Sequence, residues 1–475
     1  MDTKALRQKI LDLAIHGKLV PQDPNDEPAS VLLERIKAEK ERLIKEGKIK
    51  RSKKSAKSSN TPHYENVPFE LPNSWVWCRL EDIAYVASGS TPDKTCFVEN
   101  GVPYIKMYNL RNQKIDFAYH PQYITEEVHN GKLQRSRTEV GDLIMNIVGP
   151  PLGKLAIIPT TLPQANFNQA AVLIRPYKFK EVLVSYLKIY LEEMSEINSI
   201  ATRGSAGQVN ISLTQSQNMR IPIPPLNEVR RIIEEVSKYD ILIDSLKQNI
   251  TDIQNLIAYT KSKILDLAIH GKLVPQDPND EPAIELLKRI NPDFTPCDNG
   301  HYPVEWIETI LGELFSHNTG KALNSSNKEG IFKDYLTTSN VYWNKFDFTA
   351  IKQMPFKESE LNKCTVTKGD LLVCEGGDIG RSAIWNYDYD ICIQNHIHRL
   401  RPKIDLCVPF YYYTFAYLKE NNLIGGKGIG LLGLSSNALH KIEMPLPPLA
   451  EQQRIVQKIE ELFSVLDNIQ NALEV

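Results

Sequence analysis

The sequence has little of the chemistry that marks a secreted, membrane-spanning or metal-binding protein. Its 475 residues include seven cysteines, and none of them forms a C-x-x-C pair. This cysteine usage predicts neither a disulfide framework nor a zinc site. No run of about 18 apolar residues suggests a membrane-spanning helix, and the first residues lack the basic and apolar segments of a secretory signal. We therefore expect a cytoplasmic protein.

Sequence signatures of catalysis are equally scarce. The formal net charge of −2 neither favours nor excludes a nucleic-acid partner, because local basic clusters decide such binding. The chain has no phosphate-binding loop, no N-P-P-Y/F stretch and no convincing nucleophile or paired-carboxylate arrangement. Gly428–Gly433 matches G-x-G-x-x-G but follows no buried strand, and His396-x-His398 suits a strand with alternating faces better than a metal site. We expect no catalytic residue and no bound metal.

What the chain does contain is a long internal repeat. Residues 9–29 and 263–283 are identical at all 21 positions, at an offset of 254. A second, weaker repeat relates residues 220–244 to 443–467 at an offset of 223. Joining the two chain ends would give both halves the same order, with 35 intervening residues in one half and 37 in the other. The chain is therefore predicted to be a circularly permuted repeat with a pseudo-two-fold axis.

The residues between the repeats have the pattern of a paired helix. Apolar residues recur every seven positions from Val229 to Ile264, and a second set runs three positions later from Ile232 to Leu267. This spacing is typical of a coiled-coil seam, and a single amphipathic helix on a core rarely keeps it for so long. An equivalent seam runs through the C-terminal and then the N-terminal residues. Helices related by a perpendicular two-fold axis run antiparallel, so we expect an antiparallel rod of about 55 Å.

A chain of this length is expected to form two or three domains. Short β-rich runs alternate with Gly, Pro and Asn turns in two stretches, and each stretch ends in an amphipathic helix. The predicted fold class is α+β, with two β-rich domains separated by a long antiparallel coiled coil. The predicted segments are an N-terminal helical region (1–36), a basic linker (37–65), a first β-rich domain (66–220), a central helix with its elbow (221–290), a second β-rich domain (291–443) and a C-terminal helix (444–475).

This arrangement resembles the specificity subunit of type I restriction–modification enzymes. Each β-rich domain leads into a long helix through a P-P-L-x-E turn, at 224–228 and at 447–451. Each also contains Gly-Asp-Leu, at 141–143 and 369–371, and the first adds the runs 88–92 (S-G-S-T-P) and 102–106 (V-P-Y-I-K). The second domain departs from the pattern, because residues 317–321 (H-N-T-G-K) replace the G-x-T-P motif.

The resemblance implies two target recognition domains that read the halves of a bipartite, asymmetric site in double-stranded DNA. It also implies two modification subunits, which hold S-adenosylmethionine and methylate adenine N6, and restriction subunits that use ATP and Mg. No cofactor is expected in this chain. Half-sites one helical turn apart lie about 34–36 Å from each other, which the predicted rod can bridge. A coiled-coil scaffold with two ligand-binding heads is the alternative, and a single-chain restriction–modification enzyme would need a methyltransferase core that the sequence lacks.

Base-contacting residues are expected among polar and aromatic side chains of the divergent loops, since such side chains pair with base edges. Each candidate could instead be a solvated or turn-forming residue. The candidates in the first domain are Ser90, Thr91, Lys106, Tyr108, Asn109, Arg111, Arg135, Arg137 and Gln169. Those in the second domain are Lys321, Thr338, Ser339, Asn340, Tyr342, Glu375, Asn395 and His396.

A partner-binding role is predicted for the two identical elbows. Hydrophobic cores tolerate exchange of similar side chains, so identity that extends to polar residues suggests a second constraint, and two matching surfaces suggest two copies of one partner. Recent duplication or gene conversion is the rival explanation. The predicted partner-binding residues are Gln22, Asp23, Asp26, Gln276, Asp277 and Asp280.

Overall fold

The structure, a computed structural model, describes residues 2–50, 67–149, 152–193, 209–295, 301–323, 329–424 and 434–474. The glycine-rich segment 428–433 and most of the predicted linker lie outside these ranges. The chain divides into two compact units, which we call the N-terminal unit (Asp2–Gln248) and the C-terminal unit (Asn249–Val475). Helix α8 (Leu226–Ile269), 44 residues long, contributes to both units.

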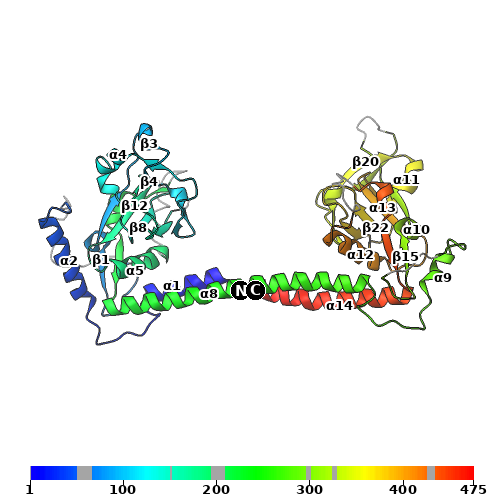
Figure 1. Ribbon diagram of the computed structural model, residues 1–475, viewed down its shortest axis with the longest axis horizontal. Helices are drawn as coiled ribbons and strands as arrows, with labels where there is room; N and C mark the ends of the chain where they lie inside the picture. Colours follow the sequence, from blue (N-terminus) through cyan, green and yellow to red (C-terminus); the bar gives the residue numbers. More distant parts are fainter. Residues whose placement is uncertain are drawn as a thin grey trace. The chain divides into compact units, whose positions relative to one another are not determined.

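The N-terminal unit contains two four-stranded sheets (Figure 1). The first has the strand order β10 (Leu155–Ile157), β8 (Leu143–Asn146), β12 (Ala171–Pro176) and β2 (Ala84–Ser88). The second has the order β11 (Asn166–Phe167), β4 (Val102–Ile105), β7 (Tyr123–Ile124) and β3 (Phe97–Val98). Short pairs join β1 (Val76–Arg79) to β14 (Arg220–Ile223), β5 (Leu110–Arg111) to β6 (Lys114–Ile115), and β9 (Val148–Gly149) to β13 (Val209–Asn210).

Helices surround these sheets. The α-helices before α8 are α1 (Thr3–Ile15), α2 (Ala29–Lys45), α3 (Leu80–Ile83), α4 (Glu126–Asn130), α5 (Lys180–Glu193) and α7 (Leu213–Gln217). Among the described residues before α8, 3-10 turns lie in loops at η2 (Lys94–Cys96), η3 (Met107–Asn109) and η4 (Gln134–Ser136).

The C-terminal unit repeats this plan. One sheet has the order β16 (Phe315–Thr319), β25 (Ile397–Pro402), β22 (Leu371–Cys374) and β23 (Ser382–Ile384). The other has the order β20 (Lys352–Phe356), β17 (Ile331–Leu336), β24 (Ile391–Ile393) and β21 (Thr365–Val366). The short pairs are β15 (Ile307–Ile310) with β26 (Glu443–Leu446) and β18 (Val341–Tyr342) with β19 (Lys345–Phe346). The remaining helices are α9 (Ala283–Lys288), α10 (Leu311–Leu314), η5 (Thr338–Asn340), α11 (Glu358–Cys364), α12 (Val408–Glu420), α13 (Ser436–His440) and α14 (Leu449–Glu474).

Strand register confirms the predicted repeat. Ile174 in β12 lies opposite Val86 of β2 and Leu143 of β8. In the same way, Leu400 in β25 lies opposite His317 of β16 and Leu371 of β22. Both of these strands are antiparallel to their neighbours, so these two sheets share a topology although their sequences have diverged. The other four-stranded sheets differ in where their fourth strand pairs, because β3 pairs with β7 whereas β21 pairs with β24.

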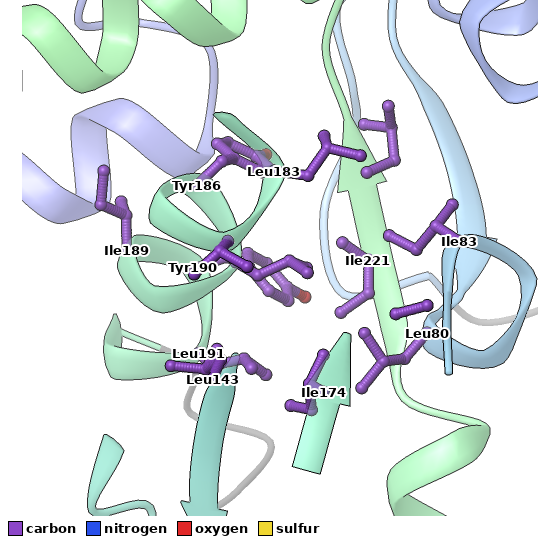
Figure 2. Close-up of a cluster of buried hydrophobic side chains, with 14 of the residues drawn as sticks. Leu80, Ile83, Leu143, Ile174, Leu183, Tyr186, Ile189, Tyr190, Leu191 and Ile221 are labelled. Carbon is purple, nitrogen blue, oxygen red and sulfur yellow. The ribbon is translucent and has the colours of Figure 1, made fainter. Parts of the chain in front are cut away.

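The core of the N-terminal unit forms where α5 packs on the strands (Figure 2). Leu183, Tyr186 and Tyr190 recur at the three- and four-residue spacing of one helix face, and all three are buried. They contact Ile174 of β12 and Ile221 of β14 within one apolar cluster. The Tyr186 hydroxyl donates to the Pro222 carbonyl at 2.7 Å, so its polar atom is satisfied inside the core.

In each unit α8 pairs with one other helix in the antiparallel direction. In the N-terminal unit Arg7 of α1 bonds to Asp240, and Gln22, further along the chain, bonds to Glu228 near the start of α8. In the C-terminal unit Lys261 bonds to Asp467, whereas Gln276 bonds to Glu451 near the start of α14. In both units the contacts move towards the start of one helix as the other segment continues towards its C-terminus. The paired segments are therefore antiparallel, as predicted for the rod.

The predicted seam is buried over only part of α8. Val229, Val236, Ile243, Ile257 and Ile264 are buried. Ile250 is half-buried, and Ile253 is 38% exposed. The heptad pattern therefore locates the face that packs but overstates its continuity.

One predicted boundary also differs from the structure. Helix α2 continues to Lys45, so the first residues of the predicted basic linker (37–65) are helical. Helix α5 is the amphipathic helix expected at the end of the first β-rich stretch. It is described to Glu193, and residues 194–208 lie outside the described ranges. The six cysteines within the described ranges are free thiols.

Candidate nucleic-acid interface

In the N-terminal unit the loops that follow strands of both sheets pack against each other at a glycine. Gly89 follows β2, and a Cβ atom there would lie 2.0 Å from the Asn168 carbonyl oxygen, so no other residue fits. The next residue, Ser90, donates its backbone N–H to the Phe167 carbonyl at 3.1 Å. Asn168 in turn donates to the Ile105 carbonyl at 3.1 Å. These contacts hold the end of β2, the end of β4 and the β11–β12 loop together.

Five predicted DNA-contacting residues belong to the segments that meet there or bond to them. They are Ser90, Thr91, Lys106, Arg135 and Gln169. Thr91, Arg135 and Gln169 are exposed. The Arg135 guanidinium donates to the Ser90 hydroxyl oxygen from Nη2 at 2.8 Å and from Nε at 3.2 Å.

A second group of candidates surrounds the β5–β6 turn. Arg111 lies over the Tyr119 ring at 4.0 Å and is 3.7 Å from the Asp116 carboxylate. The Tyr108 hydroxyl donates to the His120 carbonyl at 3.1 Å. Asn109 is fully buried, and its amide donates to the Asp116 and Tyr119 carbonyls. Asn109 therefore shapes the loop from inside.

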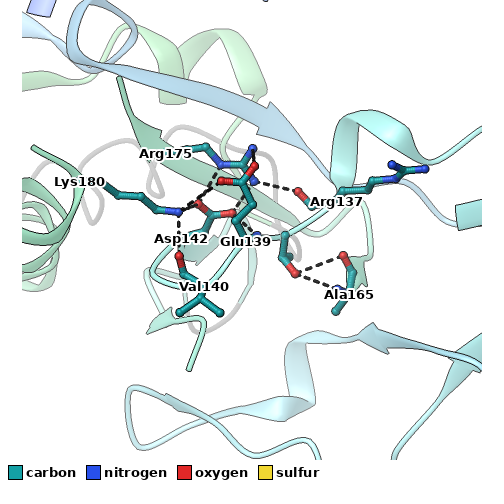
Figure 3. A network of polar contacts seen from close by, with 8 residues as sticks. Arg137, Glu139, Val140, Asp142, Ala165, Arg175 and Lys180 are labelled. Atoms are coloured by element: carbon teal, nitrogen blue, oxygen red, sulfur yellow. Dashed lines mark hydrogen bonds and ion pairs between the residues drawn. The ribbon is translucent and has the colours of Figure 1, made fainter. Parts of the chain in front are cut away.

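Arg137 is held by the unit itself. Its guanidinium donates to the Asn130 side chain at 2.7 Å and to the His129 carbonyl at 3.1 Å. Its own carbonyl accepts from Arg175, which also binds the buried Asp142 (Figure 3). Burial alone would lower the pKa of Arg175, but its hydrogen bonds to Asp142 raise that pKa above the ordinary value. This network fixes the loop between η4 and β8.

The C-terminal unit builds the same junction with different side chains. A Cβ at Gly320 would lie 2.0 Å from the Ile393 carbonyl oxygen, and Lys321 donates its backbone N–H to that carbonyl at 3.1 Å. Lys321 thus stands where Ser90 stands in the other unit. Its ammonium group donates to Glu360 at 2.6 Å and to the Pro355 carbonyl at 2.7 Å. The side chain is only 10% exposed, so its charge is paired within the unit.

The other candidates of the C-terminal unit fall into a turn and a loop. In the η5 turn Asn340 is buried and donates to the Asp347 carbonyl at 2.9 Å, as Asn109 does in its unit. Tyr342 is 39% exposed. The residues Thr338 and Ser339 belong to the same turn, and the Thr338 carbonyl accepts from Arg381. Sequence reasoning missed Arg381, whose guanidinium lies 5.1 Å from the Tyr342 ring; its place after a glycine-rich run was the available signal.

Of the last three candidates, Asn395 and His396 lie in the β24–β25 loop, and Glu375 follows β22. Glu375 donates its backbone N–H to the His396 carbonyl at 3.0 Å, and the Glu375 carboxylate lies 3.4 Å from the exposed His396 ring. Asn395 donates its backbone N–H to the Lys321 carbonyl at 3.0 Å. The structure therefore brings Lys321, Asn395 and His396 to one end of the C-terminal unit.

His398 differs from His396 because it lies inside β25, whereas the exposed His396 precedes that strand. It is buried, and its Nε2 atom lies 2.7 Å from the Leu434 carbonyl oxygen. Its Nδ1 atom lies 2.7 Å from Nε2 of His317. Burial lowers the pKa of His317 to about 4 and also lowers that of His398. Within the described residues no group of three or more His, Cys, Asp or Glu side chains could hold a metal ion.

The identical elbows have internal partners for their polar residues. Asp26 binds Arg231 at 2.6 Å, and Asp280 binds Arg454 at the same distance. Gln22 and Gln276 bind Glu228 and Glu451, and Asp23 and Asp277 accept from the backbone of Asn25 and Asn279. Burial raises the pKa of Glu228 and of Glu451. The fold therefore uses these residues, which corrects the argument that their identity exceeds what the fold demands.

The helices expose apolar side chains that the seam pattern did not mark. Leu242 of α8 is 57% exposed and Val465 of α14 is 54% exposed. These two residues occupy equivalent positions in the 223-residue repeat, one in each unit. The other strongly exposed apolar residues of α8 are Ile241, Leu256 and Tyr259. No described helix combines the length and apolar composition needed to cross a membrane.

Comparison with known proteins agrees with this repeated plan. The family described as "Type I restriction modification DNA specificity domain" matches residues 72–255 and 303–475. The chain is 28% identical over 561 residues to the type I restriction enzyme EcoEI specificity subunit of Escherichia coli, covering 99% of this chain and 91% of that protein. It is 27% identical over 540 residues to the EcoAI specificity subunit of Escherichia coli, covering 98% and 90%.

Solved structures share the fold. The HsdS subunit from Thermoanaerobacter tengcongensis aligns with a TM-score of 0.54 at 20% identity, covering 85% of this chain and 93% of that one. A chain from a study of assembly and conformational transition of the type I R-M system aligns with a TM-score of 0.55 at 20% identity, covering 86% and 94%. The first matched range spans one β-rich domain and most of α8, and the second spans the other β-rich domain and all of α14. The chain therefore belongs to the family of type I restriction–modification DNA specificity subunits.

Proposed function

We propose that this chain is the DNA-reading subunit of a type I restriction–modification complex, and that its two units recognise different halves of a bipartite, asymmetric site. The observation that carries this proposal is the pair of glycine junctions. Gly89 and Gly320 set the same backbone arrangement in both units. The residues that follow are Ser90 and Lys321, which differ in size, charge and hydrogen-bonding capacity.

This combination suits recognition of two unlike half-sites. Base edges in the major groove differ in their pattern of donors and acceptors, so a reader needs fixed side chains of matching chemistry. A common scaffold with divergent loops supplies that. We propose the exposed candidates as the base-contacting set, and we assign Asn109, Asn340 and Lys321 to holding the loops, since their side chains are satisfied within their own units. The exposed set is Thr91, Arg111, Arg135, Gln169, Ser339, Tyr342 and His396.

Catalysis is proposed to belong to the partners. In this account two modification subunits supply S-adenosylmethionine and methylate adenine N6, and restriction subunits, where present, supply ATP-driven cleavage with Mg. The chain itself is proposed to have no catalytic role and no cofactor, and the complex is proposed to work in the cytoplasm. The support is that the curated relatives are named specificity subunits of restriction enzymes.

The two modification subunits are proposed to dock on the elbows and on the neighbouring helices. Leu242 and Val465 supply one exposed apolar side chain in each unit at equivalent repeat positions. Equivalent surfaces on the two units favour two copies of the same partner. Because Asp26 and Asp280 already form ion pairs inside the chain, the exposed apolar positions are the better place to test docking.

Mapping of N6-methyladenine in the host genome, with and without the gene for this chain, tests the proposal. We expect methylation at a motif with two short fixed halves, an unread gap and no inverted symmetry, and we expect it to disappear when the gene is deleted. Unchanged methylation after deletion would contradict the DNA-reading role and favour the alternative of a scaffold with two ligand-binding heads.

A further inference from the structure

Arg135 is bound in a way that leaves one edge of its guanidinium group available. Arginine carries N–H donors on two edges, one formed by Nε and Nη2 and the other by Nη1 and Nη2. The Ser90 hydroxyl oxygen accepts from Nε at 3.2 Å and from Nη2 at 2.8 Å. The first edge is therefore occupied by Ser90. The second edge keeps a parallel pair of N–H donors, and the side chain is exposed.

The anchor for Arg135 is itself fixed. Ser90 donates its backbone N–H to the Phe167 carbonyl at 3.1 Å, and its own carbonyl accepts from the Tyr104 hydroxyl at 2.9 Å. Tyr104 is fully buried, and Gly89 before Ser90 is pressed against the Asn168 carbonyl. The Ser90 hydroxyl therefore belongs to a residue whose backbone N–H and carbonyl are both hydrogen-bonded within the unit.

The other two arginines among the candidates of this unit are committed elsewhere. Arg137 also donates from Nε and Nη2, to the His129 carbonyl and the Asn130 side chain, but Arg137 is half-buried whereas Arg135 is exposed. Arg111 lies over a tyrosine ring and near the Asp116 carboxylate. In the part of the chain that the structure describes, Arg135 forms no ion pair with a carboxylate. Its charge is therefore available to an external acceptor.

We infer that Arg135 reads a guanine in the half-site of the N-terminal unit through its Nη1 and Nη2 donors, with Ser90 as the positioning residue. Guanine presents O6 and N7 as two adjacent acceptors in the major groove, which suits a parallel pair of N–H donors. An arginine that is already oriented loses less conformational freedom on binding than a mobile one. The inference rests on the proposed DNA-reading function and adds a base identity to it.

The C-terminal unit supplies an internal contrast. Lys321 occupies the position of Ser90 there and is bound to Glu360, so that junction has no hydroxyl to hold an arginine in this way. The inference therefore applies to one half-site only, and the other half-site acts as a reference within every binding measurement.

The test begins with selection of bound duplexes from a random pool by the full chain. Binding is then measured on the selected duplex, on duplexes with each G·C pair of one half-site changed to A·T, and on duplexes with 7-deazaguanine, which lacks only the N7 acceptor. Wild type should lose about 5- to 150-fold in affinity at one guanine, the range expected for a bidentate contact. R135A should show no discrimination at that pair and unchanged discrimination in the other half-site.

Two further variants separate positioning from contact. S90A should keep part of the discrimination, and S90T, which restores a hydroxyl, should recover it. K132A is the matched control, because Lys132 is an exposed basic residue three positions before Arg135 and lies outside the proposed base-contacting set. It should discriminate at that guanine as wild type does. Discrimination by R135A equal to wild type at every G·C pair, or a half-site without any G·C pair, would overturn the inference while the bipartite target still supports the proposed function. Selection of no motif by wild type would overturn both.

Discussion

Single side chains decide what each unit presents on a shared backbone. Ser90 and Lys321 follow equivalent glycines, yet one holds an exposed arginine and the other closes an internal ion pair. Asn109 and Asn340 are the opposite case, because both are buried and both bond to the backbone of their own loop. The two units therefore differ in the residues that follow the junction glycines, while the buried asparagines bond to the loop backbone in both.

The histidine pair in the C-terminal unit predicts a pH dependence. His317 has a folded pKa of about 4, below the ordinary value of about 6.5. The unfolded chain therefore binds more protons between these two values, so this group's contribution to stability is lost as pH falls from about 6.5 towards 4. The charged and titratable groups near the pair are Glu375, Arg399 and His440.

Denaturant unfolding of the full chain at pH 7.5 and at pH 5 measures this effect, with a probe in the C-terminal unit. H317F should reduce the loss of stability between the two pH values, because it removes the titrating group. H396Q, at an exposed histidine, is the matched control and should behave as wild type. An equal loss of stability in wild type and H317F would show that the pair does not titrate as described.

Prediction from sequence was strongest for the scaffold and weakest for the exposed side chains. The junction glycines and the Gly-Asp-Leu segments could be located because backbone and packing constraints keep them, and both recur in the two units. Whether a loop asparagine points inward, as Asn109 does, depends on contacts with residues seven to ten positions away in the turn. A single sequence does not encode that direction, so buried and exposed candidates could not be separated.

At the scale of elements, repetition and periodicity predicted the helices well. The antiparallel pairing of α8 with α1 and with α14 agrees with the heptad spacing. The partial exposure of Ile250 and Ile253 does not, because the spacing marks a face of the helix and not how much of that face is covered. The polar residues of the elbows bond within the chain, so their identity does not by itself require a partner, and docking there stays a prediction.

The exposed apolar positions of the helix pairs give a docking prediction. L242D and V465D should each remove one modification subunit from the complex, and the double variant should remove both. Burying a charge in an apolar interface costs several kcal/mol unless it is paired. Because both side chains are more than half exposed, the free energy of unfolding should change by no more than roughly 0.5 kcal/mol.

Native mass spectrometry of the purified complexes counts the bound subunits. S245D, an exposed polar position on the same helix, is the matched control and should keep both partners. Full occupancy in the L242D and V465D variants would exclude these positions from the docking surface.

At the scale of the whole molecule, one chain is proposed to carry two DNA-recognition domains built on one plan. The family match covers each β-rich domain with most or all of the helix that follows it, and the sheets that contain β12 and β25 repeat the same strand order. One recognition domain should therefore be replaceable by the domain of a related protein while the second domain of this chain stays functional. The reason is that each unit has its own apolar core.

The most direct test of this claim is the exchange of residues 72–220 for the matching domain of another specificity subunit, followed by selection of bound duplexes from a random pool. The account predicts that one half of the selected motif changes, while the other half and the gap between them stay the same. A motif in which both halves change, or in which neither does, would contradict it.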